Sequence, residues 1–148
     1  MKRNHLIFFG IVALIFLLDQ AIKYCIRSKI ALGGSVLVIP NIFHLTNFKN
    51  TGAGFSILQD QTLILIFISL MVVGYILFSL DKIMQRKPLF QYLVALVLGG
   101  ALGNLYDRIV FGYVTDFLDF QVWPVFNIAD SALSIGILGI IVYLWKYD

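Results

Sequence analysis

The 148-residue chain contains no glutamate, so all eight of its acidic residues are aspartates. Its single cysteine, Cys25, excludes an intramolecular disulfide and any metal site that needs two cysteine ligands. The two histidines, His5 and His44, lie far apart without the spacing of a ligand pair, so we expect no metal and no other cofactor. Only 13% of the residues are charged, and no basic patch with interleaved aromatic residues is present, which argues against a nucleic-acid partner.

Apolar residues dominate what is present. The chain is 60% hydrophobic and its mean hydropathy is +0.92, which is too apolar for a soluble domain of this length. We therefore expect one integral membrane domain over residues 1–148, of the all-α class with four transmembrane helices. The expected helices cover about residues 6–25, 62–80, 89–106 and 128–146.

The N-terminal segment imitates a secretory signal peptide, because Lys2 and Arg3 precede an apolar run. Asp19, Gln20 and Lys23 follow that run, and no small-x-small cleavage site stands there. We therefore expect this segment to remain as the first transmembrane helix.

Two longer segments, about residues 27–61 and 107–127, connect the expected helices at one end. The first contains Gly33, Gly34 and Pro40 around the runs SVLVI and IFHLTNF, a pattern typical of short strands bounded by turns. This pattern predicts a small extracytoplasmic β-sheet in the first outer loop. The second segment is expected to hold a short structured piece that breaks at Pro124.

The short charged loops predict the orientation. Lysines and arginines at the two ends of the chain and in the loop between the second and third helices favour cytoplasmic N and C termini by the positive-inside rule. These residues are Lys2, Arg3, Lys82, Arg86, Lys87 and Lys146.

The polar groups of three helices should then meet at one depth. At about 1.5 Å per residue, Asp19 in the first helix and Asn104, Asp107 and Arg108 in the third reach similar heights near the outer boundary. Asp130 begins the fourth helix at that same level. Ionisable groups at a membrane boundary cost free energy unless they are paired or used, so this plane is the expected functional site.

Asp116 and Asp130 are the candidate catalytic pair. Two carboxyl groups held close together cannot both ionise readily, so they share a proton; one then activates a water while the other polarises a carbonyl. The alternative is that each is a helix N-cap or a solvated loop acid, because aspartate is a favoured cap. The pattern alone leaves both interpretations open.

The neighbouring polar residues have structural alternatives as well. Asp19 and Lys23 stand at i,i+4 with the acid first, which predicts an ion pair that braces the site. Asn104 is placed to face Asp107 or Arg108. Arg108 is equally suited to pair with Asp107 or to reach a substrate carbonyl or a lipid headgroup.

Three further positions fit ordinary local structure as well. Asn127, three residues before Asp130, is placed either to bond a catalytic carboxylate or to cap the fourth helix. Asn50 and Gly52 fit an ordinary turn.

Five sequence blocks, taken together and in order, resemble those of the lipoprotein signal peptidase family, also called signal peptidase II. The blocks cover all four expected helices and the first outer loop. They are DQAIK from Asp19, NTGAGFS from Asn50, GGALGNLYDR from Gly99, GYVTDFLDF from Gly112 and FNIADSAL from Phe126.

The resemblance implies an aspartic endopeptidase of the bacterial cytoplasmic membrane that cuts prolipoproteins on the amino side of a diacylglyceryl-modified cysteine. The implied partners are those prolipoprotein signal peptides and membrane lipids, and a monomer is expected. The catalytic pair of the family falls on Asp116 and Asp130. Its supporting motif residues fall on Asp19, Lys23, Asn50, Gly52, Asn104, Asp107, Arg108, Asn127 and Ala129.

The chain departs from the family pattern at two places. Gly54 replaces the usual alanine of NxGAAFS, and the sequence stops directly after the fourth helix.

Two other functions compete with the peptidase. A proton-coupled transporter predicts polar groups spread through the membrane depth, whereas this chain concentrates them at one level, and a non-catalytic scaffold leaves the paired aspartates unexplained.

Overall fold

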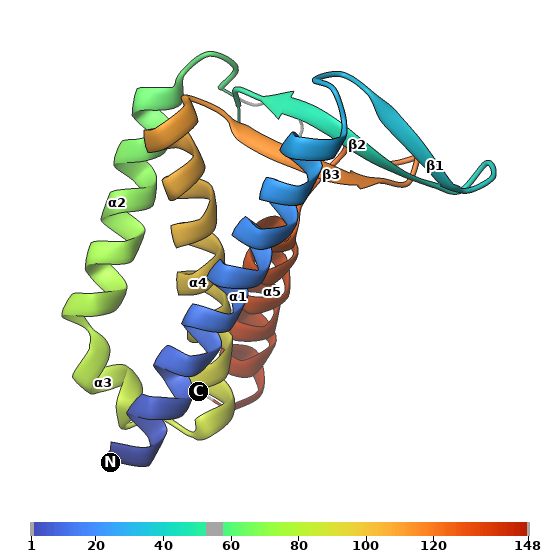
Figure 1. The fold of residues 1–148 in the computed structure, drawn as a ribbon. Coiled ribbons are helices and arrows are strands. Elements are labelled where there is room, and N and C mark those ends of the chain that lie inside the picture. Colours follow the sequence, from blue (N-terminus) through green and yellow to red (C-terminus); the bar gives the residue numbers. More distant parts are fainter. Residues whose placement is uncertain (1, 53–57, 148) are drawn as a thin grey trace.

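The structure, a computed structural model, describes residues 2–52 and 58–147 (Figure 1). Within these residues the chain forms a helical bundle with a small sheet at one end. In chain order the elements are α1 (Lys2–Lys29), β1 (Ser35–Ile39), β2 (Phe43–Asn50), α2 (Thr62–Phe78), α3 (Leu80–Met84), α4 (Pro88–Phe111), β3 (Val114–Asp119) and α5 (Ile128–Tyr147).

Helix α4 lies at the centre of the bundle and packs against α1, α2 and α5. Its apolar side chains Val94, Ala95 and Leu98 are buried together with Phe8 and Val12 of α1. The outward faces of α1, α2 and α5 are instead rich in exposed leucine, isoleucine and phenylalanine. An apolar exterior around a packed centre is what a bilayer requires, so the chain has the structure of an integral membrane protein.

Three helical stretches are long and apolar enough to cross a membrane, Arg3–Lys29, Pro88–Phe111 and Ile128–Tyr147. The predicted helix at about residues 62–80 is present as α2, but it has 17 residues and is shorter than these three. It is followed by the short helix α3, which was not predicted.

The prediction that the third helix ends near residue 106 is wrong. Helix α4 continues to Phe111 and ends at Gly112, which adopts the left-handed conformation (φ 76°) and donates its amide to the Arg108 carbonyl. Glycine adopts this conformation without a steric penalty, so it ends the helix here. Asp107 and Arg108 therefore lie in the last turns of α4 rather than in a connecting segment.

The sheet is antiparallel with the order β1-β2-β3. Strands β1 and β2 come from the first connecting segment, as predicted, but β3 comes from the second, so placing the sheet in the first loop alone was wrong. Phe48 of β2 pairs with Asp116 of β3, after a register shift between Leu45 and Phe48. The sheet lies at the end of the bundle opposite the first turn of α1 and the last turn of α5 (Figure 1).

Helix α4 approaches α5 closely at Gly100, where an added Cβ would collide with the Ala129 carbonyl oxygen. We expect Gly100→Ala to lower the free energy of unfolding by about 1–3 kcal/mol, as overpacking does. The matched control is Gly74→Ala in α2, where nothing lies within 4 Å of the added methyl. Unfolding by a denaturing detergent would measure both, and equal stabilities for the two variants would contradict this close packing.

Candidate active site

Asp116 lies in strand β3, and only 1% of the residue is exposed. Both carboxylate oxygens accept hydrogen bonds from asparagine amides. Asn50 Nδ2 donates to Oδ2 at 2.8 Å, and Asn127 Nδ2 donates to Oδ1 at 2.6 Å. The Asn50 contact follows from the sheet register, because Asn50 lies two residues along β2 from the Phe48 that pairs with Asp116.

Asp130 lies in the first turn of α5. Asn127 is the residue before this helix. Its side-chain oxygen accepts a hydrogen bond from the Asp130 backbone amide at 2.8 Å, and Asp130 Oδ2 accepts one from the Asn127 backbone amide at 3.3 Å. This reciprocal pair has the geometry of a capping box. Asn104 Nδ2 of α4 donates to the other Asp130 oxygen at 2.7 Å. The two interpretations of Asn127 therefore hold together, since it caps α5 and also bonds Asp116.

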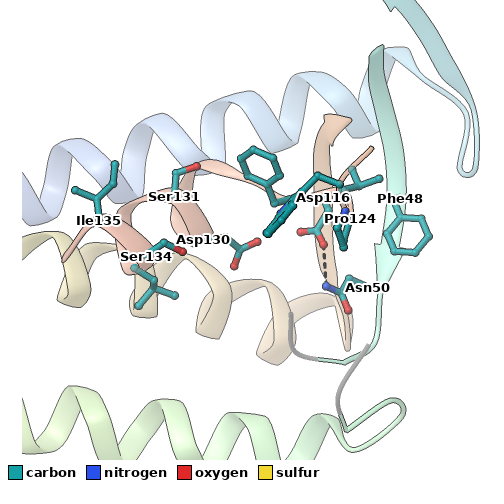
Figure 2. Close-up of a pocket in the computed structure, with 12 residues that line it drawn as sticks. Phe48, Asn50, Asp116, Pro124, Asp130, Ser131, Ser134 and Ile135 are labelled. Atoms are coloured by element: carbon teal, nitrogen blue, oxygen red, sulfur yellow. Dashed lines mark hydrogen bonds between the residues drawn. The ribbon is translucent and has the colours of Figure 1, made fainter. Parts of the chain in front are cut away.

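Asp116 and Asp130 line one cavity of about 660 Å³ between the sheet and α5. Figure 2 shows both carboxyl groups directed into this space, with the Asn50 amide bonded to Asp116. Most of the remaining wall is apolar, and it includes Phe48, Pro124 and Ile135. The volume is within the range of sites that enclose a small ligand or a few residues of a peptide.

Burial, together with the nearby charge of Asp130, raises the pKa of the Asp116 carboxyl to about 7. The hydrogen bonds from Asn50 and Asn127 and the positive charge of Lys23 oppose this rise. The ordinary value for aspartate is about 3.9. Asp116 therefore retains a proton up to near neutral pH beside a second carboxyl group, which is the protonation state that acid–base catalysis by two carboxyls requires.

Lys23 of α1 is fully buried beneath this pair. Its ammonium lies 2.8 Å from Asp19 Oδ2 and 3.1 Å from Asp107 Oδ2, and it donates to Asn104 Oδ1 at 3.1 Å. The predicted Asp19–Lys23 ion pair is present, and Asp107 forms a second ion pair with the same ammonium. Asn104 thus joins the ammonium to Asp130, and the prediction that it faces Asp107 or Arg108 is wrong.

Asp19 also connects α1 to the start of α5. Its Oδ1 accepts the Ala129 amide at 2.9 Å, and Ala129 itself is fully buried. Gln20 donates to Asp19 Oδ2 and to the Gly103 carbonyl of α4. One short carboxylate therefore fixes the relative positions of α1, α4 and α5 below the cavity.

Arg108 Nη2 donates to the Gly52 carbonyl at 3.1 Å, whereas the ion pairs of Asp107 within the described residues are with Lys23 and Arg27. Gly52 in turn donates its amide to Asn50 Oδ1 at 2.9 Å, in the turn expected from the sequence. Gly54, where the chain departs from the family pattern, lies outside the described residues. Arg108 thus holds the turn that follows Asn50 against α4.

A sequence profile described as signal peptidase (SPase) II matches residues 11–146. The lipoprotein signal peptidase of Halothermothrix orenii is 41% identical over 138 residues, which are 93% of this chain and 94% of that protein. The lipoprotein signal peptidase of Caldanaerobacter subterraneus is 45% identical over 132 residues, covering 87% and 90% of the two chains.

The chain belongs to the signal peptidase II family. Two solved structures, each described as a bacterial membrane enzyme, share the fold of this signal peptidase II family member. One is 34% identical with a TM-score of 0.89, over 94% of this chain and 87% of that one. The other is 33% identical with a TM-score of 0.85, over 95% and 94%. The resemblance noted from the five sequence blocks is thereby confirmed, and the chain is a peptidase by family.

Two residues beside the site of this signal peptidase II family member were not predicted. Arg27 Nη1 donates to Thr115 Oγ1 at 3.0 Å and lies 3.6 Å from Asp107 Oδ1. The Thr115 amide donates to Asp107 Oδ2 at 3.1 Å. Asp107 and Arg27 therefore anchor β3 one residue before Asp116. The i,i+4 series of Asp19, Lys23 and Arg27 was the signal in the sequence that could have identified Arg27.

No group of three or more histidine, cysteine or acidic side chains is arranged to hold a metal ion within residues 2–52 and 58–147. The polar side chains that line the cavity include the two carboxyl groups, the Asn50 amide and the hydroxyl groups of Ser131 and Ser134. This donor set is suited to proton transfer and to holding a water molecule.

Proposed function

We propose that this peptidase is an aspartic endopeptidase that removes signal peptides from bacterial prolipoproteins. Cleavage occurs on the amino side of the diacylglyceryl-modified cysteine. The observation that carries the proposal is that Asp116 of β3 and Asp130 of α5 line one cavity and share Asn127 as a hydrogen-bond partner. The names of the relatives supply the class of substrate.

The proposed reaction needs one proton shared by the pair. The ionised carboxylate removes a proton from a water molecule, whose oxygen attacks the scissile carbonyl, while the protonated carboxyl donates to the carbonyl oxygen. The tetrahedral diol then collapses: the C–N bond breaks as the proton taken from water passes to the leaving amine, and a diol hydroxyl returns its proton to the other carboxylate, which restores the shared proton. Asn50, Asn104 and Asn127 hold the two carboxyl groups in place.

The other predicted residues have supporting roles in this proposal. Lys23 orients Asn104, while Asp19 and the Ala129 amide fix the start of α5. Asp107 positions β3 through Thr115. Arg108 and Gly52 hold the turn beyond Asn50.

We further propose that α2 also spans the bilayer, which gives four transmembrane helices. Its 17 residues extend about 26 Å, it packs alongside α4, and its exposed side chains are apolar. The cationic loop at Lys82, Arg86 and Lys87 then lies in the cytoplasm with both termini, so Asp116 lies near the outer face of the bacterial cytoplasmic membrane. All residues of the proposed site come from one chain, so a monomer suffices.

This placement suits a lipid-anchored substrate. A signal peptide crosses the membrane, and its modified cysteine lies at the outer surface, so the scissile bond reaches the depth of the cavity. The cavity wall is largely apolar, and Trp123 and Ile135 at its edge are more than half exposed. These side chains offer contact for the apolar residues that precede the cysteine.

The test is a cleavage assay with the full chain reconstituted in vesicles of phosphatidylethanolamine and phosphatidylglycerol. A synthetic prolipoprotein peptide with a diacylglyceryl cysteine is expected to yield a product that begins at that cysteine, identified by mass spectrometry. The same peptide with an unmodified cysteine is expected to be cut far more slowly. Cleavage elsewhere, or of neither peptide, would overturn the proposed function.

The rate should fall on the alkaline side of neutrality. The Asp116 carboxyl has a pKa of about 7, so the pair loses its remaining proton as the pH rises through this value. We expect kcat to fall about tenfold for each pH unit well above 7, because only the singly protonated pair is active. Initial rates at saturating substrate between pH 6 and 9 would measure this, and a constant kcat up to pH 9 would contradict a shared proton.

A further inference from the structure

A second cavity, of about 450 Å³, lies far from Asp116 at the other end of the bundle, where α2 connects through α3 to α4 (Figure 1). Side chains of α2, α3, α4 and α5 line it. None of the residues assigned above to the active site is among them.

The lining changes from charged to apolar along the helix axes. Ser79, Lys82 and Arg86 lie where the helices end, while Val94 and Val97 lie about 9 and 14 Å along α4 from its first residue. Such a cavity fits a molecule with a negatively charged head and a long alkyl chain, aligned with the helices.

We propose that this cavity binds an anionic diacyl phospholipid, whose phosphate contacts Lys82 and Arg86 and whose acyl chain follows α4 inward. Lysine and arginine form charge-assisted hydrogen bonds with phosphate oxygens. Basic pockets between transmembrane helices at the cytoplasmic side are suited to anionic headgroups. The Arg86 guanidinium lies 5.6 Å from the Phe90 ring, at the mouth of the same cavity.

Charge also distinguishes this ligand from the other candidate occupant, the N-terminal part of a substrate signal peptide. That part of a signal peptide is positively charged, so Lys82 and Arg86 would repel it. The exposed Asp81 contributes one negative charge beside three positive ones, because Lys87 follows Arg86. The end of the cavity therefore has a net positive charge.

A bound acyl chain would have a structural consequence. Val97 lines this cavity and also a smaller one, of about 260 Å³, that extends between α2 and α4 to Asn104 and Asp130. A lipid chain that enters from the charged end would fill space between α2 and the rest of the bundle. The lipid should therefore stabilise the position of α2.

The experiment is native mass spectrometry of the full chain in a neutral detergent, with phosphatidylglycerol and phosphatidylcholine of identical acyl chains added in equal amounts. We expect one phosphatidylglycerol to be retained in preference to phosphatidylcholine. In the Lys82→Gln/Arg86→Gln variant its affinity should fall roughly 30-fold, which corresponds to about 1 kcal/mol for each removed charge. Both side chains are exposed, and an unchanged unfolding temperature in detergent without lipid would show that the variant folds.

The matched control is Lys87→Gln/Lys146→Gln, which removes the same charge at the same end. Both of these ammonium groups lie over the Tyr147 ring, and neither lines the cavity. An affinity within about twofold of wild type in this control supports a defined site, whereas an equal loss in both variants would overturn it in favour of diffuse attraction.

Two other results would also overturn the proposal. One is equal retention of the two phospholipids, and the other is competition by free glycerol phosphate as effective as that by phosphatidylglycerol, since the acyl chain would then contribute nothing. These measurements detect binding and not cleavage, so their failure would leave the proposed function intact.

Discussion

Replacing Asp116 or Asp130 by asparagine is expected to lower kcat by on the order of 10³–10⁴-fold. Each change keeps the size of the side chain but removes an ionisable group from the pair that lines the cavity. An asparagine oxygen still accepts a hydrogen bond from Asn127 or Asn104, so the fold should be retained. Single-turnover cleavage of the diacylglyceryl peptide measures the effect, together with binding of the same peptide.

The pair acts as a unit in the proposed mechanism, so its two members should not contribute additively. The Asp116→Asn/Asp130→Asn variant is expected to be no slower than either single variant. The matched control is Asp119→Asn on the same strand, because Asp119 bonds Thr46 and lies outside the cavity. If either single variant cleaved at the wild-type rate, the assignment of the pair would be refuted.

Replacing Lys23 by methionine should produce the largest loss of stability. The ammonium is fully buried between Asp19 and Asp107, and its removal leaves the buried Asp19 without a counter-ion and Asp107 with only Arg27, at 3.6 Å. Loss of one partner from a buried ion pair costs about 3–5 kcal/mol. A typical folded domain has only about 5–15 kcal/mol of net stability, so this change should leave part of the protein unfolded. Tryptophan fluorescence during unfolding in mixed detergent micelles would measure the loss.

Two further variants separate the buried charge from a general loss of packing. Lys29→Met, at the exposed end of α1, should change the free energy of unfolding by less than about 0.5 kcal/mol. Adding Asp19→Asn to Lys23→Met should restore part of the stability, because Asp107 keeps Arg27 as its counter-ion and no buried carboxylate is then left without one. A Lys23→Met protein as stable as the wild type would show that the ammonium does not compensate these carboxyl groups.

The sequence predicted the parts of the site that depend on local spacing or on chain topology. The i,i+4 spacing of Asp19 and Lys23 predicted their ion pair. Helix lengths placed Asn104 and Asp130 at the same depth, and the two residues are joined by a hydrogen bond of 2.7 Å. These predictions succeeded because a helix converts residue number directly into height.

Long-range pairing was harder to predict. The strand β3 has no turn residue that marks its pairing with β2, and its contacts cross from residue 50 to residue 114. The bond from Arg108 to the Gly52 carbonyl joins α4 to that same connecting segment and was missed for the same reason. Arg27 falls in the predicted connecting segment of about residues 27–61, because the extension of α1 to Lys29 was not predicted.

An infrared titration of the carboxyl C=O stretch, with the full chain in detergent, tests the shared proton most directly. We expect one protonated carboxyl group that persists at pH 6 and is lost as the pH rises through about 7. In the Asp116→Asn variant this signal should no longer titrate near neutrality. If instead every carboxyl group of the wild-type protein were ionised by pH 5, the two aspartates would hold no common proton and the proposed mechanism would be contradicted.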